Sequence, residues 1–192
     1  MLLFLSMTEP DSDGVNEQIE NLLAKLAKGD VAAMGPLYDM TRTSVYAFAL
    51  SMLKNSFDAE DVMHDCYVKL FSSARRYSPR GKPMAYILSI VRNECIDRLN
   101  EHKRGAVLPE ESWETLLKAE HNTDRLLIAE GMALLKDDER QIVLLHAISG
   151  FKHREIADFL KMPLSTVLSK HSRSIQKLRK HFAGGDDNNE AY

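Results

Sequence analysis

The chain has few cysteines, no long apolar run and none of the short motifs of common enzymes. Its 192 residues hold only two cysteines, Cys66 and Cys95, which fit no CxxC pattern and both lie on apolar helical stripes. We therefore expect reduced core cysteines rather than a disulfide. No apolar run approaches membrane-spanning length. The apolar start MLLFL is short and follows no basic residue, which makes it a poor signal peptide. These absences predict a cytoplasmic protein without membrane insertion, whose natural start is Met1 or Met7.

Signs of catalysis are equally scarce. The sequence contains no Gly-rich phosphate loop and no cluster with metal-ligand spacing. Residues 149–152 match SxxK, but the companion motifs SDN and KTG are missing and Gly150 is expected to end a helix there. The carboxylates near Asp58 have no apolar pocket or histidine arranged to tune them for acid–base work. We expect no enzymatic activity, no cofactor and no bound metal.

Charge is distributed in blocks, although the net charge is only −3. Residues 72–104 carry eight Lys or Arg against three acids, and residues 161–181 carry six against none. Residues 105–139, between them, carry nine acids against three bases. Two basic blocks separated by an acidic one suggest two nucleic-acid contacts on one chain.

The first half of the chain shows helical periodicity and no strand pattern. Helices are predicted over residues 15–28, from Asp30 through Tyr38 with a kink or restart at Gly35-Pro36, and over residues 41–54. A fourth helix is predicted to be capped by Asp58, whose acidic patch has no base nearby in sequence. Taken alone, that patch could be an ordinary solvated face.

A basic stretch over residues 75–104 begins as a Pro- and Gly-containing turn and continues as a helix from Met84. One face of this helix is apolar. The other carries Tyr86, Asn93 and arginines, which are suited to stacking on unpaired bases and holding phosphates. The alternative is an ordinary amphipathic helix in which Tyr86 belongs to the core.

The second half predicts a helix-turn-helix. Helices are expected from Thr123, from Asp137 to Gly150, over residues 152–160, and from Pro163 to about Phe182. The last helix is basic and free of acids, and small Ala157 suits the crossing of the two final helices. The alternative is a generic helical hairpin. We therefore predict an all-α fold of two small helical domains, residues 15–104 and 123–183, with a flexible acidic linker at 105–122 and a disordered tail at 184–192.

Several motifs resemble those of bacterial RNA polymerase sigma factors of the extracytoplasmic-function (ECF) type. Residues 58–62, 70–71, 84–93 and 96–99 resemble the second conserved region, a helical bundle. Residues 155–157, Leu160, 165–167 and 177–179 resemble the fourth. The order and spacing of these motifs, over residues 17–181, make the resemblance specific.

The resemblance implies a protein that joins core RNA polymerase and directs it to promoter DNA. It implies docking on the clamp helices of the largest subunit through Asp58, Glu60, Asp61 and Asp65. Capture and melting of the minus-ten element would involve Arg76, Tyr77, Arg80, Lys82, Tyr86, Arg92, Asn93 and Arg98. Reading of the minus-thirty-five element would involve Ser165, Thr166, Ser169, Lys170, Ser172, Arg173, Lys177 and Lys180. An anti-sigma factor would be a further partner.

The chain departs from the family pattern at Gly35-Pro36, which is expected to interrupt a helix that the family keeps continuous, and at three further residues. Tyr86 stands where tryptophan is usual, Leu168 where a lysine or arginine is usual, and His171 where an apolar residue is usual. The competing interpretation is a helix-turn-helix regulator that binds duplex DNA without polymerase. That interpretation does not explain the basic helix or the acidic patch.

Overall fold

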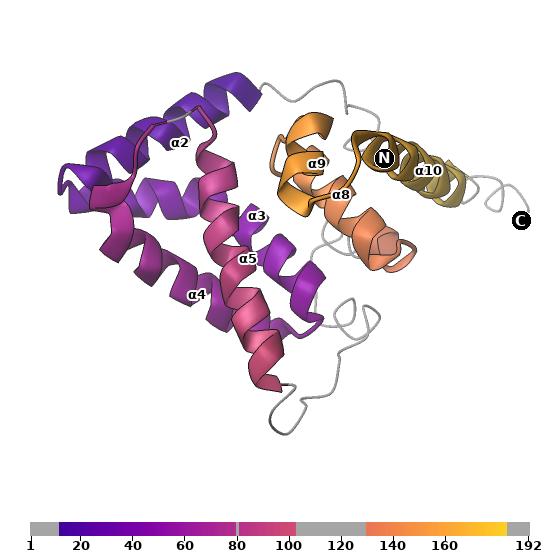
Figure 1. Ribbon diagram of the computed structural model, residues 1–192, viewed down its shortest axis with the longest axis horizontal. Helices are drawn as coiled ribbons and strands as arrows, with labels where there is room; N and C mark the ends of the chain where they lie inside the picture. The colour runs from indigo at the N-terminus through magenta and orange to yellow at the C-terminus, as the bar shows by residue number, and fades with distance from the viewer. Residues whose placement is uncertain (1–11, 80, 103–129, 184–192) are drawn as a thin grey trace, which may run out of the picture. The chain divides into compact units, whose positions relative to one another are not determined.

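The computed structural model describes residues 12–79, 81–102 and 130–183, and all regular structure within these ranges is helical. The chain divides into two compact units, one holding helices α2 to α5 and the other holding α8 to α10 (Figure 1). The predicted linker at 105–122 and the predicted tail at 184–192 lie outside the described residues. No helix in the described ranges is long and apolar enough to cross a membrane.

The first unit is a bundle of four long helices. They are α2 (Ser12–Ala27), α3 (Met34–Leu53), α4 (Ser56–Ser73) and α5 (Pro83–His102), with short 3-10 turns η1 (Val31–Ala33) and η2 (Ala74–Arg76). Helices α3, α4 and α5 all pack against one another, and α2 lies against α3 and α5. The fully buried side chains of Leu23, Phe48, Leu70, Ile87 and Leu88 fill the space between them.

Helix α3 is continuous, whereas the sequence predicted two helices at this point. Asp30 caps only the 3-10 turn η1, where its carboxylate accepts a hydrogen bond from the Ala32 amide at 3.1 Å. The α-helix then begins at Met34 and runs to Leu53. Pro36 falls in the first turn of α3, where backbone N–H groups have no partner within the helix and a proline costs little. The predicted interruption at Gly35-Pro36 is therefore the change from 3-10 to α-helix.

Helix α4 is capped by Asn55, whereas the sequence predicted that Asp58 would be the cap. The Asn55 side chain accepts a hydrogen bond from the Asp58 amide at 3.0 Å. Lys54, in the left-handed conformation at φ 55°, ends α3 just before this cap. The helix therefore starts at Ser56, and Asp58 lies inside its first turn.

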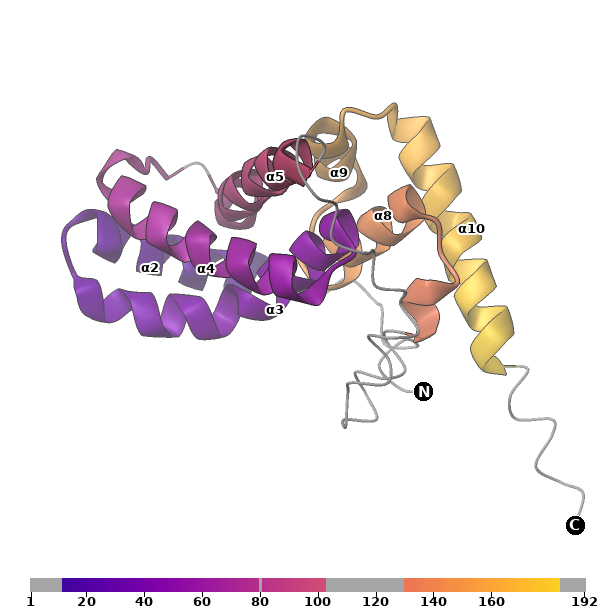
Figure 2. The same cartoon turned by 90° about the horizontal axis from the view of Figure 1, so that it is seen from below.

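The second unit contains α8 (Asp137–Ala147), α9 (His153–Leu160) and α10 (Leu164–Ala183), preceded by helical residues 130–133. Buried Arg140 ties α8 to the chain before it. Its Nε donates to the Met132 carbonyl at 2.9 Å, and its Nη2 donates to the Leu135 carbonyl at 2.7 Å. Figure 2 shows α10 as the long straight helix that follows α9.

The turn between α9 and α10 has the geometry of a helix-turn-helix. Lys161 adopts the left-handed conformation at φ 57° and ends α9. The Pro163 carbonyl accepts from the Thr166 and Val167 amides, so Pro163 lies just before α10 rather than inside it. Ile156, Val167 and Leu178 are buried in the core that α9 and α10 share with α8.

Candidate functional site

The predicted acidic patch on α4 is exposed at Glu60, Asp61 and Asp65, but not at Asp58. Asp58 is 3% exposed. Its Oδ1 lies 3.4 Å from Nη1 of Arg98, and its Oδ2 lies 3.5 Å from Nε2 of His102. Asp58 therefore faces the interior of the bundle, where its carboxylate is not presented to a partner on the surface. A direct contact of Asp58 with polymerase stays a prediction that this burial does not support.

Arg98 joins α5 to α4, where the sequence predicted a contact with DNA. Besides Asp58, its guanidinium reaches Oδ2 of Asp61 at 3.6 Å. The sequence shows no base near the patch because Arg98 is 40 residues further along the chain than Asp58. Packing of α5 on α4 brings them together, so the guanidinium is engaged within the protein.

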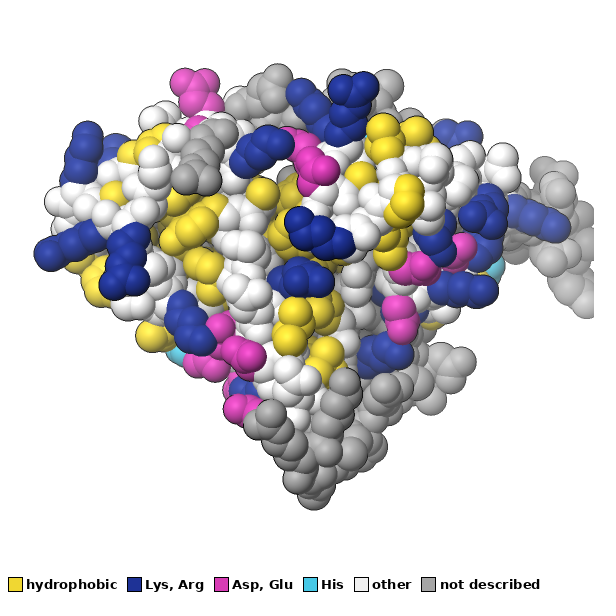
Figure 3. Space-filling view, in the orientation of Figure 1, with side chains coloured by type: hydrophobic (Ala, Val, Ile, Leu, Met, Phe, Trp, Pro, Cys, Tyr) yellow, Lys and Arg dark blue, Asp and Glu magenta, His cyan; other side chains and the backbone are white. Residues whose placement is uncertain are grey.

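The outer face of α4 also carries large apolar side chains, to which the sequence interpretation gave no role in binding. Phe57 is 71% exposed, Val68 is 60% exposed and Phe71 is 49% exposed. With Asp61 they follow the spacing of neighbours on one helix face. Acidic side chains gather at the lower left in Figure 3, over α4 and α5. The spacing could have revealed this face, because Phe57, Val68 and Phe71 all fall off the buried stripe of Val62, Cys66 and Leu70.

The loop between η2 and α5 is anchored to α2 by one carboxylate. Oε1 of Glu20 accepts from the Tyr77 hydroxyl at 3.1 Å and from the Gly81 amide at 2.9 Å. Burial, together with the Glu20 carboxylate, raises the pKa of Tyr77 above its ordinary value. Gly81 has φ +68°, a conformation that other residues adopt only under strain. The loop that is predicted to contact DNA is therefore held at Tyr77 and at Gly81.

Tyr86 and Tyr77 form a tilted pair with ring centroids 4.9 Å apart. The Tyr86 hydroxyl lies 3.2 Å from Oγ of Ser73. Tyr86 is half-buried, as are Tyr77 and Arg92. Among the other residues predicted to contact the minus-ten element, Arg76, Lys82 and Asn93 are exposed. Arg80 lies outside the described residues. The aromatic pair thus offers part of a ring surface, flanked by exposed polar and basic groups.

On α10 the predicted DNA-contacting residues divide into two groups. The first group comprises Ser165, Ser169, Ser172, Arg173 and Lys180, which are exposed, and half-buried Thr166. The Arg173 side chain folds back on its own helix, where Nε donates to the Ser169 carbonyl at 3.1 Å. Leu168 is 47% exposed, so it lies outside the core and offers an apolar contact surface.

Lys170 and Lys177 form the second group, because both pair with acids of α8. Lys170 forms an ion pair with Asp138, and Nζ of Lys177 lies 2.7 Å from Oε2 of Glu139. Although burial opposes it, the Lys170 ammonium lowers the pKa of Asp138 below its ordinary value. These pairs hold α10 against α8, so the two lysines are less available to phosphates than the sequence predicted.

Comparison with known families identifies the chain. Residues 37–105 match the family described as Sigma-70 region 2, and residues 125–178 match Sigma-70 region 4. The two matches cover α3 to α5 and α8 to α10, in the order in which the motifs occur. The chain belongs to the sigma-70 family and is of the ECF type.

Individual relatives agree with this assignment. The ECF RNA polymerase sigma factor SigK of Mycobacterium sp. (strain KMS) is 26% identical over 175 residues, which is 86% of this chain and 91% of SigK. SigX of Bacillus subtilis (strain 168), also an ECF RNA polymerase sigma factor, is 28% identical over 158 residues, covering 76% of this chain and 81% of SigX.

Solved structures show the same fold. The sigma factor RpoE of Bartonella quintana, crystallised with the anti-sigma factor NepR, superimposes with a TM-score of 0.61 at 21% identity. That superposition covers 78% of this chain and 96% of RpoE. CnrH, in complex with the cytosolic domain of CnrY, gives a TM-score of 0.58 at 22% identity and covers 91% of this chain and 99% of CnrH. The expected all-α fold with sigma region 2 and region 4 units is confirmed.

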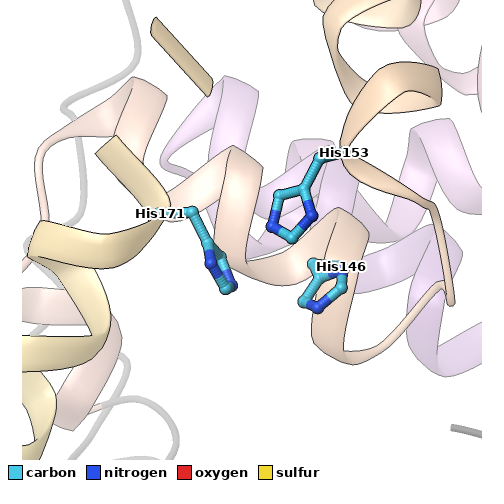
Figure 4. A group of neighbouring side chains, drawn as sticks. All are labelled: His146, His153 and His171. Carbon is cyan, nitrogen blue, oxygen red and sulfur yellow. The ribbon is translucent and has the colours of Figure 1, made fainter. Parts of the chain in front are cut away.

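One cluster in the region 4 unit was not foreseen. His146 near the end of α8, His153 at the start of α9 and His171 in α10 point toward one another (Figure 4). Each offers one ring nitrogen, and these three nitrogens all lie within 4.8 Å of one another. The sequence showed no metal-ligand spacing here because the three residues come from three different helices.

Proposed function

We infer that this protein is a promoter-specificity subunit that binds core RNA polymerase and directs it to begin transcription. The observation that carries the inference is the presence of regions 2 and 4, in that order, on one chain. A helix-turn-helix regulator that does not join polymerase has no need of a region 2 bundle, so that alternative is not favoured. In this role, none of the protein's own residues catalyses a reaction. We place it in the cytoplasm, where it would meet polymerase and DNA.

The outer face of α4 is our candidate for the polymerase contact, on the clamp helices of the largest subunit. Exposed Phe57 and Val68 supply apolar area, and Glu60, Asp61 and Asp65 supply negative charge for a basic partner. Buried aromatic anchors carry much of the energy of protein interfaces, while charges at the edge steer association. Asp58 contributes indirectly, because its contact with Arg98 holds α5 against α4.

The loop at 77–82 and the start of α5 are our candidate for minus-ten recognition. The Tyr77–Tyr86 pair can stack on a base that leaves the duplex, and exposed Arg76 and Asn93 can bind the strand that carries it. Glu20 supports this role by holding the loop in one conformation before DNA arrives. A preformed loop reduces the entropy lost on binding.

The exposed face of α10 is our candidate for reading the minus-thirty-five element. Recognition helices contact base edges from their N-terminal turns, which here present Ser165, Ser169 and Arg173. Lys180 lies further along and suits a phosphate. Leu168 can contact a thymine methyl group but cannot form a hydrogen bond.

An anti-sigma factor is a further proposed partner. Two proteins of the same fold, RpoE and CnrH, are seen in complex with NepR and with the cytosolic domain of CnrY. An anti-sigma factor that covered the exposed apolar side chains of α4 would prevent the sigma factor from binding polymerase.

The proposed function is tested by transcription in vitro from genomic DNA fragments, using core polymerase with and without the protein. We expect discrete start sites that require the protein. Protein that binds duplex DNA but neither binds core polymerase nor yields start sites would instead be a conventional regulator.

The docking surface is tested by titrating core polymerase with Phe57→Ser and Asp61→Lys variants. Each should weaken binding by about tenfold or more, as expected for loss of an interface anchor or reversal of a steering charge. Glu17→Lys is the matched control, because Glu17 is exposed on α2, away from α4. Equal affinity of all variants would remove the docking role from α4, while leaving the fold assignment intact.

A further inference from the structure

The histidine cluster, His146, His153 and His171, is the feature of this protein that sigma factor function leaves unexplained. The rings pack closely, with centroid separations of 4.5 Å between His146 and His153, 4.7 Å between His146 and His171, and 4.6 Å between His153 and His171. Packing alone would favour apolar side chains at these half-buried positions. Imidazole brings two nitrogens per ring that must find partners.

The hydrogen bonding of His146 fixes which of its two ring nitrogens carries a lone pair. Nδ1 of His146 lies 2.9 Å from the Phe151 carbonyl, which can only accept, so Nδ1 carries the proton. This contact places the lone pair of His146 on Nε2. A histidine that binds a metal through one ring nitrogen usually donates the N–H of the other to an oxygen, as His146 does to the Phe151 carbonyl. Such a hydrogen bond fixes the tautomer and the orientation of the ring.

The other two rings have buried nitrogens without partners. Nε2 of His153 and Nε2 of His171 are inaccessible to solvent, and neither finds a hydrogen-bond partner in the described part of the chain. An unsatisfied buried polar atom costs free energy, which a bound cation would offset. Burial, together with the neighbouring rings, lowers the pKa of His171 to about 4 and lowers that of His153 below its ordinary value. Imidazole binds a metal ion in its neutral form, and the burial of these two rings favours that form.

The spacing of the nitrogens is close to that of a metal site. Zn–N bonds of about 2.0–2.1 Å at tetrahedral angles place ligand nitrogens about 3.3 Å apart. The nitrogens of the cluster lie within 4.8 Å of one another. Small rotations of the side chains, with no change in the helices, would bring them into range.

We propose that His146, His153 and His171 form a binding site for one divalent transition-metal ion of the class that prefers imidazole, with Zn²⁺ the first candidate. Three protein ligands leave the fourth position of a tetrahedral ion to water. Imidazole also suits copper and nickel, so Zn²⁺ is selected by geometry and availability rather than by ligand type alone.

The ion would connect α9 and α10, the two helices of the helix-turn-helix, to α8. His146 is at the end of α8, His153 begins α9 and His171 is in the middle of α10. Metal binding would therefore stabilise the folded region 4 unit and fix the orientation of α10. This effect on α10 bears on promoter reading only if the proposed function holds, whereas metal binding itself does not depend on it.

The test is a titration of full-length, untagged protein, first freed of metal by a chelator, with Zn²⁺ in competition with a chromogenic chelator of micromolar affinity. We expect one Zn²⁺ per chain and, with Co²⁺, the visible absorption of a tetrahedral site. His171→Leu and His153→Leu should weaken binding at least about 100-fold, since even changes to groups behind the ligands typically cost 10–100-fold. His64→Gln, which alters an exposed histidine on α4, should bind as the parent does.

Thermal unfolding distinguishes loss of the site from loss of the fold. Zn²⁺ at 100 times its Kd should raise the unfolding midpoint by on the order of 10 °C in the parent and not in His171→Leu. His171→Leu should remain folded without metal, since it supplies an apolar residue at a half-buried position. The proposal is overturned if the parent fails to compete for Zn²⁺, or if His153→Leu and His171→Leu bind Zn²⁺ as tightly as the parent does. Neither result depends on polymerase, so a failure here leaves the sigma factor function untouched.

Discussion

Arg98 provides the sharpest test of the first unit, because sequence and structure give it different roles. If it contacts DNA, its removal should impair promoter opening and leave stability unchanged. If it pairs with Asp58, its removal should destabilise the bundle. Arg98→Met keeps most of the apolar stem and removes only the charged end, so the two roles can be separated.

The expected size of the effect follows from the burial of the partner. Removing one member of a buried ion pair typically costs about 3–5 kcal/mol, because the other charge is left uncompensated. Here Asp58 is 3% exposed, but the Arg98 side chain is 26% exposed, the contact is 3.4 Å long, and His102 stays 3.5 Å from Asp58 when Arg98 is removed. We therefore expect a loss of about 2–3 kcal/mol, below that range. For a domain of this size that lowers the unfolding midpoint by about 10–20 °C.

The assay is thermal unfolding of the full chain by circular dichroism, with hydrogen exchange to locate the effect in α4 and α5. Arg92→Met is the matched control, since Arg92 is half-buried on the same helix and forms no ion pair with the described residues. Adding Asp58→Asn to Arg98→Met should restore part of the loss, because the buried charge is then gone. A midpoint for Arg98→Met equal to that of Arg92→Met, with promoter opening lost, would refute the reasoning and return Arg98 to the DNA surface.

Three further outcomes are expected. Tyr86→Ala should weaken promoter opening by about 1–3 kcal/mol while Tyr86→Phe does not, as followed by permanganate footprinting; undiminished opening in Tyr86→Ala would make the ring a packing residue. Arg173→Ala should relax selection at one base position by about 1–3 kcal/mol, whereas Lys180→Ala should weaken all sequences alike and lower the salt slope by about one; unchanged stringency in binding-site selection would exclude Arg173 as a base reader. Burial raises the pKa of Cys66 and of Cys95 to about 12 from an ordinary 9.0, so both native thiols stay protonated at pH 8 and should resist iodoacetamide until the chain unfolds. Labelling of the native protein at the rate of a free thiol would contradict this burial. Above pH 9 the thiols of the unfolded chain lose protons that those of the native chain keep, so the free energy of unfolding should fall as pH rises.

The helices and their buried faces could be predicted from sequence because the pattern that defines them is local. Met84, Ile87, Val91 and Cys95 recur at helical spacing, and all four are buried in α5. The same holds for Val167 and Leu178 in α10. A residue's place on a stripe depends only on its neighbours within a turn or two, which the sequence displays directly.

Roles that depend on a partner far along the chain could not be predicted in this way. Asp58 has the chemistry of a helix cap, but Asn55 stands three residues earlier and makes the capping hydrogen bond. Asp58 then falls on the inner side of α4, where packing presents Arg98 to it. No property of residues 55–61 alone distinguishes an exposed acid from one that meets an arginine 40 residues away.

The same limitation affects the charge of α10 and therefore its expected interaction with DNA. Counting bases along the helix treats every lysine as available to phosphate, yet Lys170 and Lys177 are paired with Asp138 and Glu139 of α8. A phosphate that approached either lysine would have to compete with a carboxylate already in place. Affinity for DNA and its dependence on salt should therefore follow the smaller number of unpaired cations rather than the total. The acids of α8, which sequence assigned only to the start of a helix, thus help to set the strength with which α10 can hold a promoter.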